Sequence, residues 1–524
     1  MKLRKTEVAP TASILKELSS QGLVQLQANL ESAEQEVREL RTVRTDQIRN
    51  LAKTLTDAWT DPVAVRGDRT FVDDPVCNQL CLDEEFSTLL AHPLLQRLNH
   101  IKQLSFSYLV FPSATHTRLS HSLGVCKHVE MALDVVFRNN VVYSADSGNR
   151  ESIAIGPEER RQFIAKAKSA ALLHDIGHGP FGHALDRFIG FIDPQRPMTH
   201  PDKNLSREYI AKYLPNYLPR GVYAAELSAI LNKGRANLQG WDCFLADLVD
   251  SSLDVDRMDY LKRDAHMSGL SMGVTNTTAL IERICPYREG NDIVLTYDSS
   301  ALSYVDDFLR ARDLMFRNCY DHPRKVAAER IFTRLVQILI REHGIDVSRV
   351  MLLTDEQILT LLALAAIGST RTKNLLQSLL QNVDYQQIYE TGINVQNPQI
   401  NVWLDHRVRG RGKQAYVELP DTWERTLAET AGLPEESTWQ ILVVVPAHET
   451  STPVVTGARV LYKTDTGHVT KDVFAALPTL KEHLKELTLD RQKIRVFCDG
   501  RLTAQQKERV RIAAADLFSG EVRG

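Results

Sequence analysis

Several features that mark other classes of protein are scarce or missing in this sequence. Its 7 cysteines are scattered over 524 residues, and only Cys77 and Cys81 lie close together. Because no second pair completes a zinc-site spacing, they indicate free thiols in a reducing compartment, and we expect a cytoplasmic protein. We expect no signal peptide and no membrane association. The N-terminus lacks an apolar run, and the most apolar stretch, Ile358 to Gly368, is far shorter than the ~20 residues that span a bilayer.

A strong charge of one sign is also absent. The formal net charge is -3, so no overall attraction to nucleic acid or anionic membrane is expected. The basic segment HRVRGRGK, from His406 to Lys413, could contact nucleic acid. No aromatic residues alternate with its charges, so an exposed basic loop is the favoured interpretation. The sequence has no G-x-x-x-x-G-K-[ST] phosphate loop, and nothing supports an ATPase.

Residues 1–60 form the first of three segments. Their apolar residues step by threes and fours, which predicts a helix with a heptad-like stripe that needs a partner. The stripe consists of Leu23, Leu26, Leu30, Ala33, Val37 and Leu40. Two interpretations stay open, namely packing on the protein's own body and packing in a homo-oligomer.

Residues 61–390 have mainly helical patterns, whereas residues 391–524 change in character. In the latter segment, WQILVVVPA and KIRVFC predict buried strands, ARVLYKTD predicts a weaker strand, and KDVFAALPTLKEHLKEL predicts a helix. We therefore expect a mainly α protein with an N-terminal helical segment, a large helical body and a small C-terminal α+β module.

A dense set of polar residues follows an apolar, alanine-rich run in AKSAALLHDIGHGPFGH. His174, Asp175, His178 and His183 fall within ten residues. Imidazole and carboxylate groups suit a divalent metal such as manganese, iron or zinc. Two adjacent ligands cannot complete a metal site, and a His-Asp pair alone is also typical of an ordinary helix end.

Other segments supply candidates for the missing ligands, with His121 before the pair and Asp256 after it. Arg118 lies three residues before His121 and therefore on the same helix face. Two helical segments carry residues spaced by four, with Asp256, Tyr260 and Asp264 on one and Arg312, Phe316 and Tyr320 on the other. Such stripes favour a polar pocket inside a helical body, although solvated helix faces give the same pattern.

The sequence resembles the SAM-and-HD-domain deoxynucleoside triphosphate triphosphohydrolases and the related bacterial dGTP triphosphohydrolases. Matching stretches run in the same order over roughly residues 70–345, namely QRLNHIKQL, YLVFPSATHTRLSHSLGV, ALLHDIGHGPFGHALDRF, DVDRMDYLKRD and RNCYDHPRKV. HDIGHGPFGH together with HTRLSHSLGV is far more specific than a His-Asp pair. The resemblance implies a helical HD-domain core over residues 61–390.

In that family a histidine, the His-Asp pair and a distant aspartate hold a metal ion. These ligands match His121, His174, Asp175 and Asp256. The resemblance implies one tightly bound divalent ion per active site, such as manganese, iron, zinc or magnesium. Additional magnesium could accompany the triphosphate.

The resemblance also assigns the groups around the reacting phosphate. His183 matches the general acid for the departing ribose oxygen, and Asp186 matches the residue that orients it. His178, His200 and Arg118 match groups that contact the phosphates near the metal. A histidine that titrates near neutrality suits a leaving-group acid, and arginine offsets the charge of a triphosphate.

The remaining assignments concern the deoxynucleotide. By resemblance, the triphosphate is held by Arg257, Tyr260 and Arg312, the sugar 3′-hydroxyl by Gln103 and Asp264, and the 2′ position is crowded by Leu104 and Tyr320. A close wall excludes an added hydroxyl by steric clash. Ala91 and Asn99 stand where nucleotide-activated animal members have an aspartate and an arginine. We therefore do not expect the same activator site, whereas a different nucleotide effector stays open.

One leading hypothesis and two alternatives follow. The leading hypothesis is metal-dependent hydrolysis of deoxynucleoside triphosphates to deoxynucleoside and tripolyphosphate by a homo-oligomer. The first alternative is an HD-type nuclease, phosphodiesterase or nucleotidase that acts on another phosphoester, which the His-Asp pair alone also allows. The second is a nucleotide-sensing scaffold, which the complete ligand set disfavours.

Overall fold

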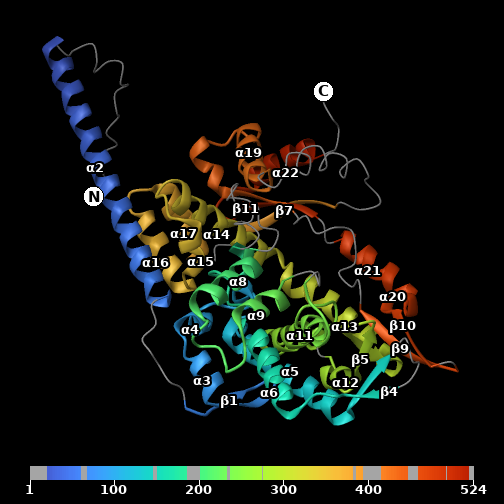
Figure 1. Cartoon of the computed structure of the whole chain (residues 1–524). Coiled ribbons are helices and arrows are strands. Elements are labelled where there is room, and N and C mark those ends of the chain that lie inside the picture. Colours follow the sequence, from blue (N-terminus) through green and yellow to red (C-terminus); the bar gives the residue numbers. More distant parts are fainter. Residues whose placement is uncertain are drawn as a thin grey trace.

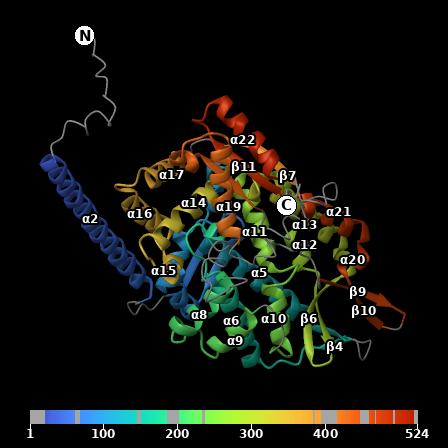
Figure 2. The same ribbon diagram turned by 90° about the horizontal axis from the view of Figure 1, so that it is seen from above.

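The computed structural model describes most of the chain, and most of what it describes is helical (Figures 1 and 2). The described residues are 20–60, 68–144, 150–185, 201–232, 237–273, 275–381, 385–392, 415–445, 458–465, 467–490 and 493–518. The basic segment His406–Lys413 lies outside them. The predicted mainly α fold is confirmed, and none of the described helices is both long and apolar enough to cross a bilayer.

Helix α2 (Ser20–Thr60) projects from the body of the molecule in both views (Figures 1 and 2). Its C-terminal part packs against α15 (Val347–Leu352) and α16 (Asp355–Ala366). Ile48 and Ala52 are completely buried there. The apolar residues of α2 therefore have different roles along the helix, because only those in its last turns cover the apolar core.

The predicted stripe lies on the projecting part of α2. Val37 and Leu40 are 49% and 57% exposed. The side chains of Leu23, Leu26 and Leu30 lie outside the described part of the chain. The described members of the stripe are thus not covered by the protein's own body.

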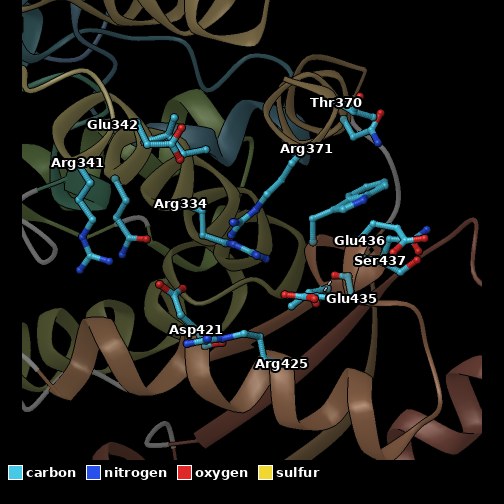
Figure 3. A pocket seen from close by; sticks show the side chains of 16 residues that line it. Arg334, Arg341, Glu342, Thr370, Arg371, Asp421, Arg425, Glu435, Glu436 and Ser437 are labelled. Atoms are coloured by element: carbon cyan, nitrogen blue, oxygen red, sulfur yellow. Dashed lines mark hydrogen bonds between the residues drawn. The ribbon is translucent and has the colours of Figure 1, made fainter. Parts of the chain in front are cut away.

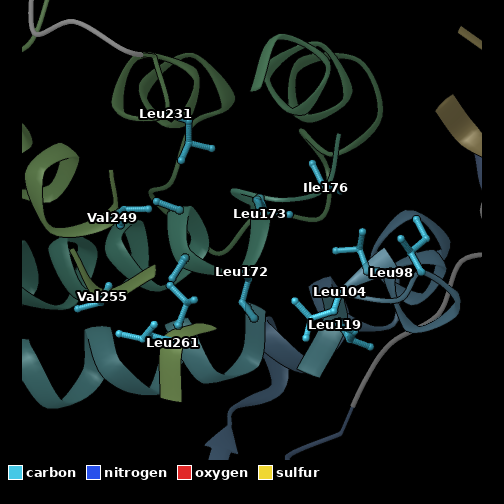
Figure 4. Packing of buried hydrophobic residues seen from close by; sticks show 14 of the residues in the cluster. Leu98, Leu104, Leu119, Leu172, Leu173, Ile176, Leu231, Val249, Val255 and Leu261 are labelled. Carbon is cyan, nitrogen blue, oxygen red and sulfur yellow. The ribbon is translucent and has the colours of Figure 1, made fainter. Parts of the chain in front are cut away.

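The helical body surrounds the predicted site. Its elements are α3 (Glu84–Leu90), α4 (Pro93–Arg97), η1 (Leu98–His100), η2 (Ser105–Leu109), α5 (Arg118–Asn139), α6 (Pro157–Leu173), α8 (Pro201–Tyr213), α9 (Ala224–Ile230), α10 (Trp241–Val249), α11 (Val255–Ser268), η3 (Ser271–Gly273), α12 (Thr277–Ile281), η4 (Ser299–Ala301), α13 (Leu302–Met315), η5 (Phe316–Tyr320), α14 (Pro323–Arg341) and α17 (Thr370–Leu380). Helix α5 packs on both α6 and α11, and Leu172 and Leu261 are completely buried in this region (Figure 4).

Local signals explain where these three helices begin. The Thr117 side chain accepts from the backbone N–H of Ser120 and caps α5. Asp254 caps α11 in the same way, because it accepts from the backbone N–H of Arg257. Helix α6 begins with Pro157, whose fixed φ suits the first turn. The caps place Arg118 and Asp256 in the first turns of α5 and α11.

A six-stranded sheet borders the helical body, with the strand order β10-β9-β6-β5-β3-β4. The strands are β3 (Val141–Ser144), β4 (Arg150–Ser152), β5 (Ile284–Glu289), β6 (Asp292–Asp298), β9 (Arg459–Thr464) and β10 (Gly467–Asp472). Strand β3 pairs in parallel with β5, and β6 pairs in parallel with β9. A separate hairpin joins β1 (Thr70–Asp74) to β2 (Asn78–Leu82). Sequence patterns did not predict the strands within residues 70–298.

A three-stranded antiparallel sheet organises much of the C-terminal part. Strand β11 (Lys493–Asp499) lies between β7 (Tyr385–Gly392) and β8 (Ile441–Val444). The accompanying helices are α19 (Ala415–Thr430), η7 (Glu435–Gln440), α20 (Val473–Ala476), α21 (Pro478–Asp490) and α22 (Ala504–Leu517). Helix α19 packs on β8 and on α22, and a separate apolar cluster forms around Leu427, Val496 and Phe518. The strands predicted from the C-terminal sequence are present, and the single helix predicted for KDVFAALPTLKEHLKEL is divided at Leu477 into α20 and α21.

The border expected between residues 390 and 391 falls inside β7, which runs from Tyr385 to Gly392. In addition, β9 and β10 extend the sheet of the helical body, although both follow residue 391. The division into segments 1–60, 61–390 and 391–524 stays a prediction. The described strands show that part of the third segment completes the body instead of standing apart from it.

A buried ionic cluster joins the body to the C-terminal part. Glu424 of α19 is completely buried. Its Oε1 lies 3.1 Å from Nε of Arg330, and its Oε2 lies 3.3 Å from Nη1 of Arg334, both on α14. Oε1 also accepts from the backbone N–H of Val443 at 2.8 Å. One carboxylate therefore ties together α14, α19 and β8.

Replacing this carboxylate tests how strongly the two parts depend on each other. We expect Glu424→Ala to lower the free energy of unfolding by about 3–5 kcal/mol, because buried Arg334 loses its counter-charge and buried Arg330 keeps only Asp421. Urea unfolding followed by circular dichroism measures this loss. Glu429→Ala, at an exposed position of the same helix, is the control and should stay within about 0.5 kcal/mol of the wild type. Equal stability of the two variants would contradict the prediction.

Candidate active site

Three segments bring the four predicted metal ligands together. His121 comes from α5, His174 and Asp175 follow the last residue of α6, and Asp256 lies in the first turn of α11. Nε2 of His121 lies 2.9 Å from Oδ1 of Asp256 and 3.9 Å from Oδ2 of Asp175. Nε2 of His174 lies 3.7 Å from Oδ1 of Asp256. One ligand atom each from His121, His174 and Asp175 lies within 4.8 Å of the others. Ligands about 2.0–2.2 Å from one metal ion have comparable separations.

Hydrogen bonds orient both histidine rings so that Nε2 faces the cluster. Nδ1 of His174 lies 2.8 Å from the backbone oxygen of Ala171, which can only accept, so Nδ1 carries the proton. Its Nε2 is buried and has no hydrogen-bond partner among the described residues. Nδ1 of His121 lies 2.9 Å from Oδ2 of Asp259, which favours the same tautomer. Nε2 of His174 thus points a lone pair into the cluster, whereas Nε2 of His121 shares with Asp256 a proton that a metal ion would displace. This donor set fits a divalent metal ion.

Electrostatics also favour a cation at this position. Burial by itself would lower the pKa of His121, but hydrogen bonds to Asp256 and Asp259 outweigh burial and raise that pKa to about 10. Burial opposes ionisation of Asp256, yet His121 and His174 lower its pKa to about 2. The pKa of Asp175 is likewise held well below its usual range, against burial, by His174, His178 and Arg118. Ionised carboxylates therefore converge on this point and require positive charge.

Asp259 supports His121 from behind and was not found by sequence reasoning. Its Oδ2 lies 2.9 Å from Nδ1 of His121 and 2.8 Å from Nε of Arg263. Arg263 reaches on to Asp74 of β1 at 2.7 Å. A carboxylate that accepts from a ligand histidine fixes the tautomer and the ring orientation. The available signal was its spacing, because Asp259 follows Asp256 by three residues and shares its helix face.

Two glycines provide the space that these charges need. A Cβ at Gly124 of α5 would lie 1.9 Å from Oδ1 of Asp259, so the glycine lets α5 and α11 approach each other. A Cβ at Gly182 would lie 2.3 Å from Nη2 of Arg118, and the φ of Gly182 is +48°. Nη1 of Arg118 donates to Oδ2 of Asp175 at 2.6 Å. Its Nε and Nη2 are buried without a partner in the described part of the chain, which leaves two donors for an anion.

Buried hydrogen bonds hold the loop that follows the His-Asp pair. Arg97, completely buried, donates to the backbone oxygens of Ile176 at 2.7 Å and His178 at 2.9 Å. The backbone N–H of Phe181 donates to Oδ1 of Asp355 at 2.7 Å. Arg97 thus connects the motif QRLNHIKQL to the loop, and Asp355 holds the loop from α16.

The predicted catalytic histidines lie beside the metal ligands. Nε2 of His178 lies 3.1 Å from Oδ1 of Asp175 and 3.6 Å from Oδ2 of Asp202, which sequence reasoning missed. The ring centroids of His178 and His183 are 5.0 Å apart, and His183 is exposed. An exposed imidazole next to the cluster can reach a bound leaving group. The other two predicted catalytic residues, Asp186 and His200, lie outside the described residues.

A polar wall extends from the metal ligands along α11. The ring of Tyr260 lies 6.4 Å from that of His121 and 6.4 Å from that of Tyr320. Nε of Arg312 donates to the Tyr260 hydroxyl at 3.4 Å, and the Tyr320 hydroxyl donates to Oδ2 of Asp264 at 2.7 Å. The structure therefore brings these four predicted substrate residues together on one side of the candidate metal site.

The end of this wall contains a residue that the sequence did not reveal. Nε2 of His116 lies 2.8 Å from Oδ1 of Asp264, and both side chains are buried. The backbone N–H of Gln103 donates to the backbone oxygen of His116 at 2.9 Å. Oε1 of Gln103 is buried without a partner in the regions the structure describes, and the next residue, Leu104, is buried. Gln103 and Leu104 thus lie next to the segment that carries His116.

Arg257, which was predicted to hold the triphosphate, is paired within the protein in this structure. Its Nη1 donates to Oδ2 of Asp254 and to the backbone oxygen of Ser251. Burial would lower the pKa of Arg257, but Asp254 outweighs burial and raises it. The guanidinium group is therefore paired with the carboxylate that caps its own helix.

The helical spacing assumed for Arg312, Phe316 and Tyr320 is only partly correct. Helix α13 ends at Met315, and Phe316–Tyr320 form the π-helical turn η5. The turn still brings the rings of Phe316 and Tyr320 within 5.0 Å, and the Arg312 guanidinium lies 5.0 Å from the Phe316 centroid. Such turns are frequent at functional sites and cannot be read from spacing.

A serine-hydrolase pattern also occurs but lacks the required context. Residues 269–273 have the sequence GLSMG, which matches G-x-S-x-G. Ser271 lies in the short 3₁₀ helix η3, directly after α11. A nucleophile elbow needs a strand before the serine and a helix after it. The local structure therefore does not support serine nucleophilic catalysis.

With this geometry in view, the comparison with protein families gives the class. Residues 118–263 match the family model of the HD domain. The matched range contains the four predicted metal ligands as well as Asp259. The chain therefore contains an HD domain, and the predicted resemblance to the HD-domain triphosphohydrolase family is confirmed.

Individual relatives refine this result. The chain is 32% identical over 243 residues to an uncharacterized protein of Bacillus subtilis, covering 46% of this chain and 49% of that protein. It is 27% identical over 287 residues to an uncharacterized protein of Mycoplasma genitalium, covering 53% and 63%. The deoxynucleoside triphosphate triphosphohydrolase SAMHD1 of Homo sapiens is 25% identical over 278 residues, covering 48% and 41%. The chain thus spans 41–63% of the length of these relatives.

Two solved structures share the fold. A phosphohydrolase of Bacteroides thetaiotaomicron has a TM-score of 0.59 at 21% identity, covering 83% of this chain and 100% of the other. A hypothetical protein of Aquifex aeolicus has a TM-score of 0.57 at 20% identity, covering 84% and 100%. At these identities the likeness concerns the fold alone.

The support that Asp259 gives to His121 leads to a prediction about metal binding. We expect Asp259→Asn to weaken Mn²⁺ binding by about 10- to 100-fold, the usual effect of losing a carboxylate behind a ligand histidine. Calorimetric titration of the metal-free protein with Mn²⁺ measures the affinity, and thermal unfolding checks that the variant is folded. Asp307→Asn, at an exposed site on α13, is the control and should bind like the wild type. An unchanged affinity in folded Asp259→Asn protein would refute the supporting role.

Proposed function

We propose that this protein is a cytoplasmic, metal-dependent hydrolase that converts deoxynucleoside triphosphates to deoxynucleoside and tripolyphosphate. The observation that carries this proposal is the continuous polar wall from the metal-ligand cluster to the Tyr320–Asp264 pair. Along it, Tyr260 lies 6.4 Å from both His121 and Tyr320. The presence of SAMHD1 enzymes among the relatives supports the same substrate class.

The proposed reaction begins at the metal end of the wall. His121, His174, Asp175 and Asp256 would hold a divalent ion such as manganese, iron, zinc or magnesium. When bound, such an ion supplies an activated water and polarises a phosphoryl oxygen. Arg118 binds an oxygen of the α-phosphate through the two N–H groups that have no other partner among the described residues.

The leaving group needs a proton when the bond between the α-phosphorus and the sugar 5′-oxygen breaks. His183 supplies it, because its exposed imidazole lies beside His178 and the metal ligands. His178 is held next to Asp175 at 3.1 Å and can contact the phosphates from there. The predicted partners Asp186 and His200 complete this group in the proposal.

The residues proposed to contact the sugar account for the selection of deoxynucleotides over ribonucleotides. Asp264 accepts from Tyr320 and has a second close neighbour in His116, so its carboxylate is fixed and can accept from a 3′-hydroxyl. Gln103 contributes the buried Oε1 that has no partner within the described regions. Leu104 and Tyr320 form the wall at the 2′ position, where an added hydroxyl would clash.

The triphosphate itself is assigned to Tyr260 and Arg312, which are joined by a hydrogen bond on the polar wall. Arg257 joins them only after it releases Asp254, since the two groups form an ion pair in this structure. Extra magnesium bound with the substrate would offset part of the charge of about four units on a triphosphate. Substrate binding therefore includes a change of partner for Arg257.

Two alternative functions share parts of this site. A nuclease, phosphodiesterase or nucleotidase could use the same metal ligands, but it would not need the second cluster around Asp264. A nucleotide-sensing scaffold would not need the converging carboxylates and the oriented histidines. The combination of both clusters favours the triphosphohydrolase.

Product identification tests the proposed reaction. Incubation with each of the four common deoxynucleoside triphosphates plus Mn²⁺ should give deoxynucleoside and tripolyphosphate in mass spectrometry. Asp175→Ala should lower the rate by more than ~100-fold, since losing a metal ligand exceeds the effect of losing a supporting group. Asp307→Asn is the control. Release of monophosphate or diphosphate products, or no product from protein with bound metal, would exclude the proposal.

We also propose that the protein forms a homo-oligomer through α2. The stripe continues in heptads, with Val37 and Leu40 exposed at successive core positions. In a parallel pairing, Glu36 would face Arg41 of the partner subunit, which is the flanking position where opposite charges stabilise coiled coils. A second copy of the same helix thus supplies both the apolar and the charged complement.

Light scattering after size-exclusion chromatography tests this interface. The wild type should have at least twice the mass of one chain, and the double variant Val37→Glu/Leu40→Glu should have a smaller mass because it places charges at the core of the stripe. Gln35→Glu/Thr42→Glu adds the same charge outside the stripe and should leave the mass unchanged. A monomeric wild type, or an unchanged mass of the stripe variant, would rule out this interface.

A further inference from the structure

A second polar cavity lies between the helical body and the C-terminal part of the chain. Its volume is about 530 Å³, and its lining comes from α14, α17, α19 and η7 (Figure 3). None of its lining residues belongs to the candidate active site. The volume falls within the range of roughly 300–1,000 Å³ that is usual for small-molecule sites.

The floor of this cavity consists of buried hydrogen-bond donors. Arg334 and Gln337, adjacent on one face of α14, are 3% and 6% exposed. Nη1 of Arg334 donates to the backbone oxygen of Ile441 at 3.2 Å. Its Nε and the Nε2 of Gln337 have no hydrogen-bond partner in the described part of the chain. Because a buried donor without an acceptor is unfavourable, these two groups indicate a ligand that brings acceptor oxygens.

Positive charge gathers above this floor. Figure 3 shows the side chains of Arg334 and Arg371 pointing toward each other across the cavity. Burial lowers the pKa of Arg334, Glu424 opposes that shift, and the positive charge of Arg371 adds to it. Within the described residues, no carboxylate lies within ion-pair distance of Arg371 or Arg341. An anion between the two guanidinium groups would relieve this repulsion.

The remaining lining suits an organic ligand. Trp439 provides a buried aromatic wall, and Arg501 covers its ring at 4.8 Å from the centroid. Asp421 lines the opposite side, where it is engaged by Arg330 at 2.6 Å. Glu435 and Glu436 lie exposed at the start of η7. Because they repel an anion, the negatively charged part of a ligand is expected on the side of the arginines.

We propose that this cavity binds a phosphorylated small molecule whose phosphate accepts hydrogen bonds from Arg334, Gln337 and Arg371. The planar fork of arginine matches the oxygens of a phosphate, and the cavity has room for a ligand of nucleotide size. The organic part of the ligand lies against Trp439. This proposal does not depend on the proposed hydrolysis, because the two sites share no residue.

Calorimetric titration with inorganic phosphate and with ATP tests the site, using the full chain in the presence of a metal chelator. The wild type should bind both probes, and ATP more tightly than phosphate. Arg371→Gln should weaken ATP binding about 10- to 100-fold, since one charge-assisted phosphate contact is lost. Arg310→Gln, at an exposed arginine of α13, is the matched control and should bind like the wild type.

A second variant separates binding from folding. Gln337→Leu removes a buried donor that has no partner and keeps a similar size, so the ligand-free protein should unfold at the same temperature or higher. The same variant should weaken ATP binding at least tenfold and reduce the thermal stabilisation that ATP gives. Failure of the wild type to bind either probe, or equal affinities of wild type and both cavity variants, would overturn the proposal.

Discussion

Buried carboxylates at the junction of α5, α6 and α11 have to be neutralised, and this requirement organises the centre of the molecule. Asp175 and Asp259 are buried and Asp256 is only partly exposed, and an uncompensated buried charge costs several kcal/mol. His121 bridges two of them, at 2.9 Å from each, and Arg118 binds the third at 2.6 Å. The same geometry leaves imidazole nitrogens and carboxylate oxygens converging on one point, so structural neutralisation and metal binding use one set of groups.

Contacts in the rest of the fold fix the positions of α5, α6 and α11. Arg97 carries hydrogen bonds from the segment before α5 to the loop after α6, and Glu424 carries ion pairs from α19 to α14. Strand β9 joins the sheet of the body through its parallel pairing with β6. The C-terminal residues are therefore part of the framework around the site. The arginine-lined cavity lies at the same seam as Glu424, where Arg334 contributes to both.

Sequence reasoning named candidate residues where local motifs carry the chemistry. The candidate ligands His121, His174, Asp175 and Asp256 were named from motifs and resemblance, and the chain brings them together. Sequence reasoning missed groups that act through long-range contacts. His116 and Asp202 carry no local pattern of their own, Asp259 has only its spacing from Asp256, and each is recognised by its partner in the fold. Pairing of Arg257 with Asp254, and the π-helical turn before Tyr320, depend on packing that spacing does not encode.

The sequence by itself determined the mainly α character, the C-terminal strands and the identity of the polar residues, because periodicity and capping act within a few residues. Only the tertiary structure decided which histidine nitrogen is available, which carboxylates are buried together, and that β9 completes the sheet of the body. Most of these properties arise from contacts between residues far apart in the sequence, such as His121 with Asp259, which are 138 positions apart. The free energy of such contacts depends on burial and distance, and neither is fixed until the helices have packed.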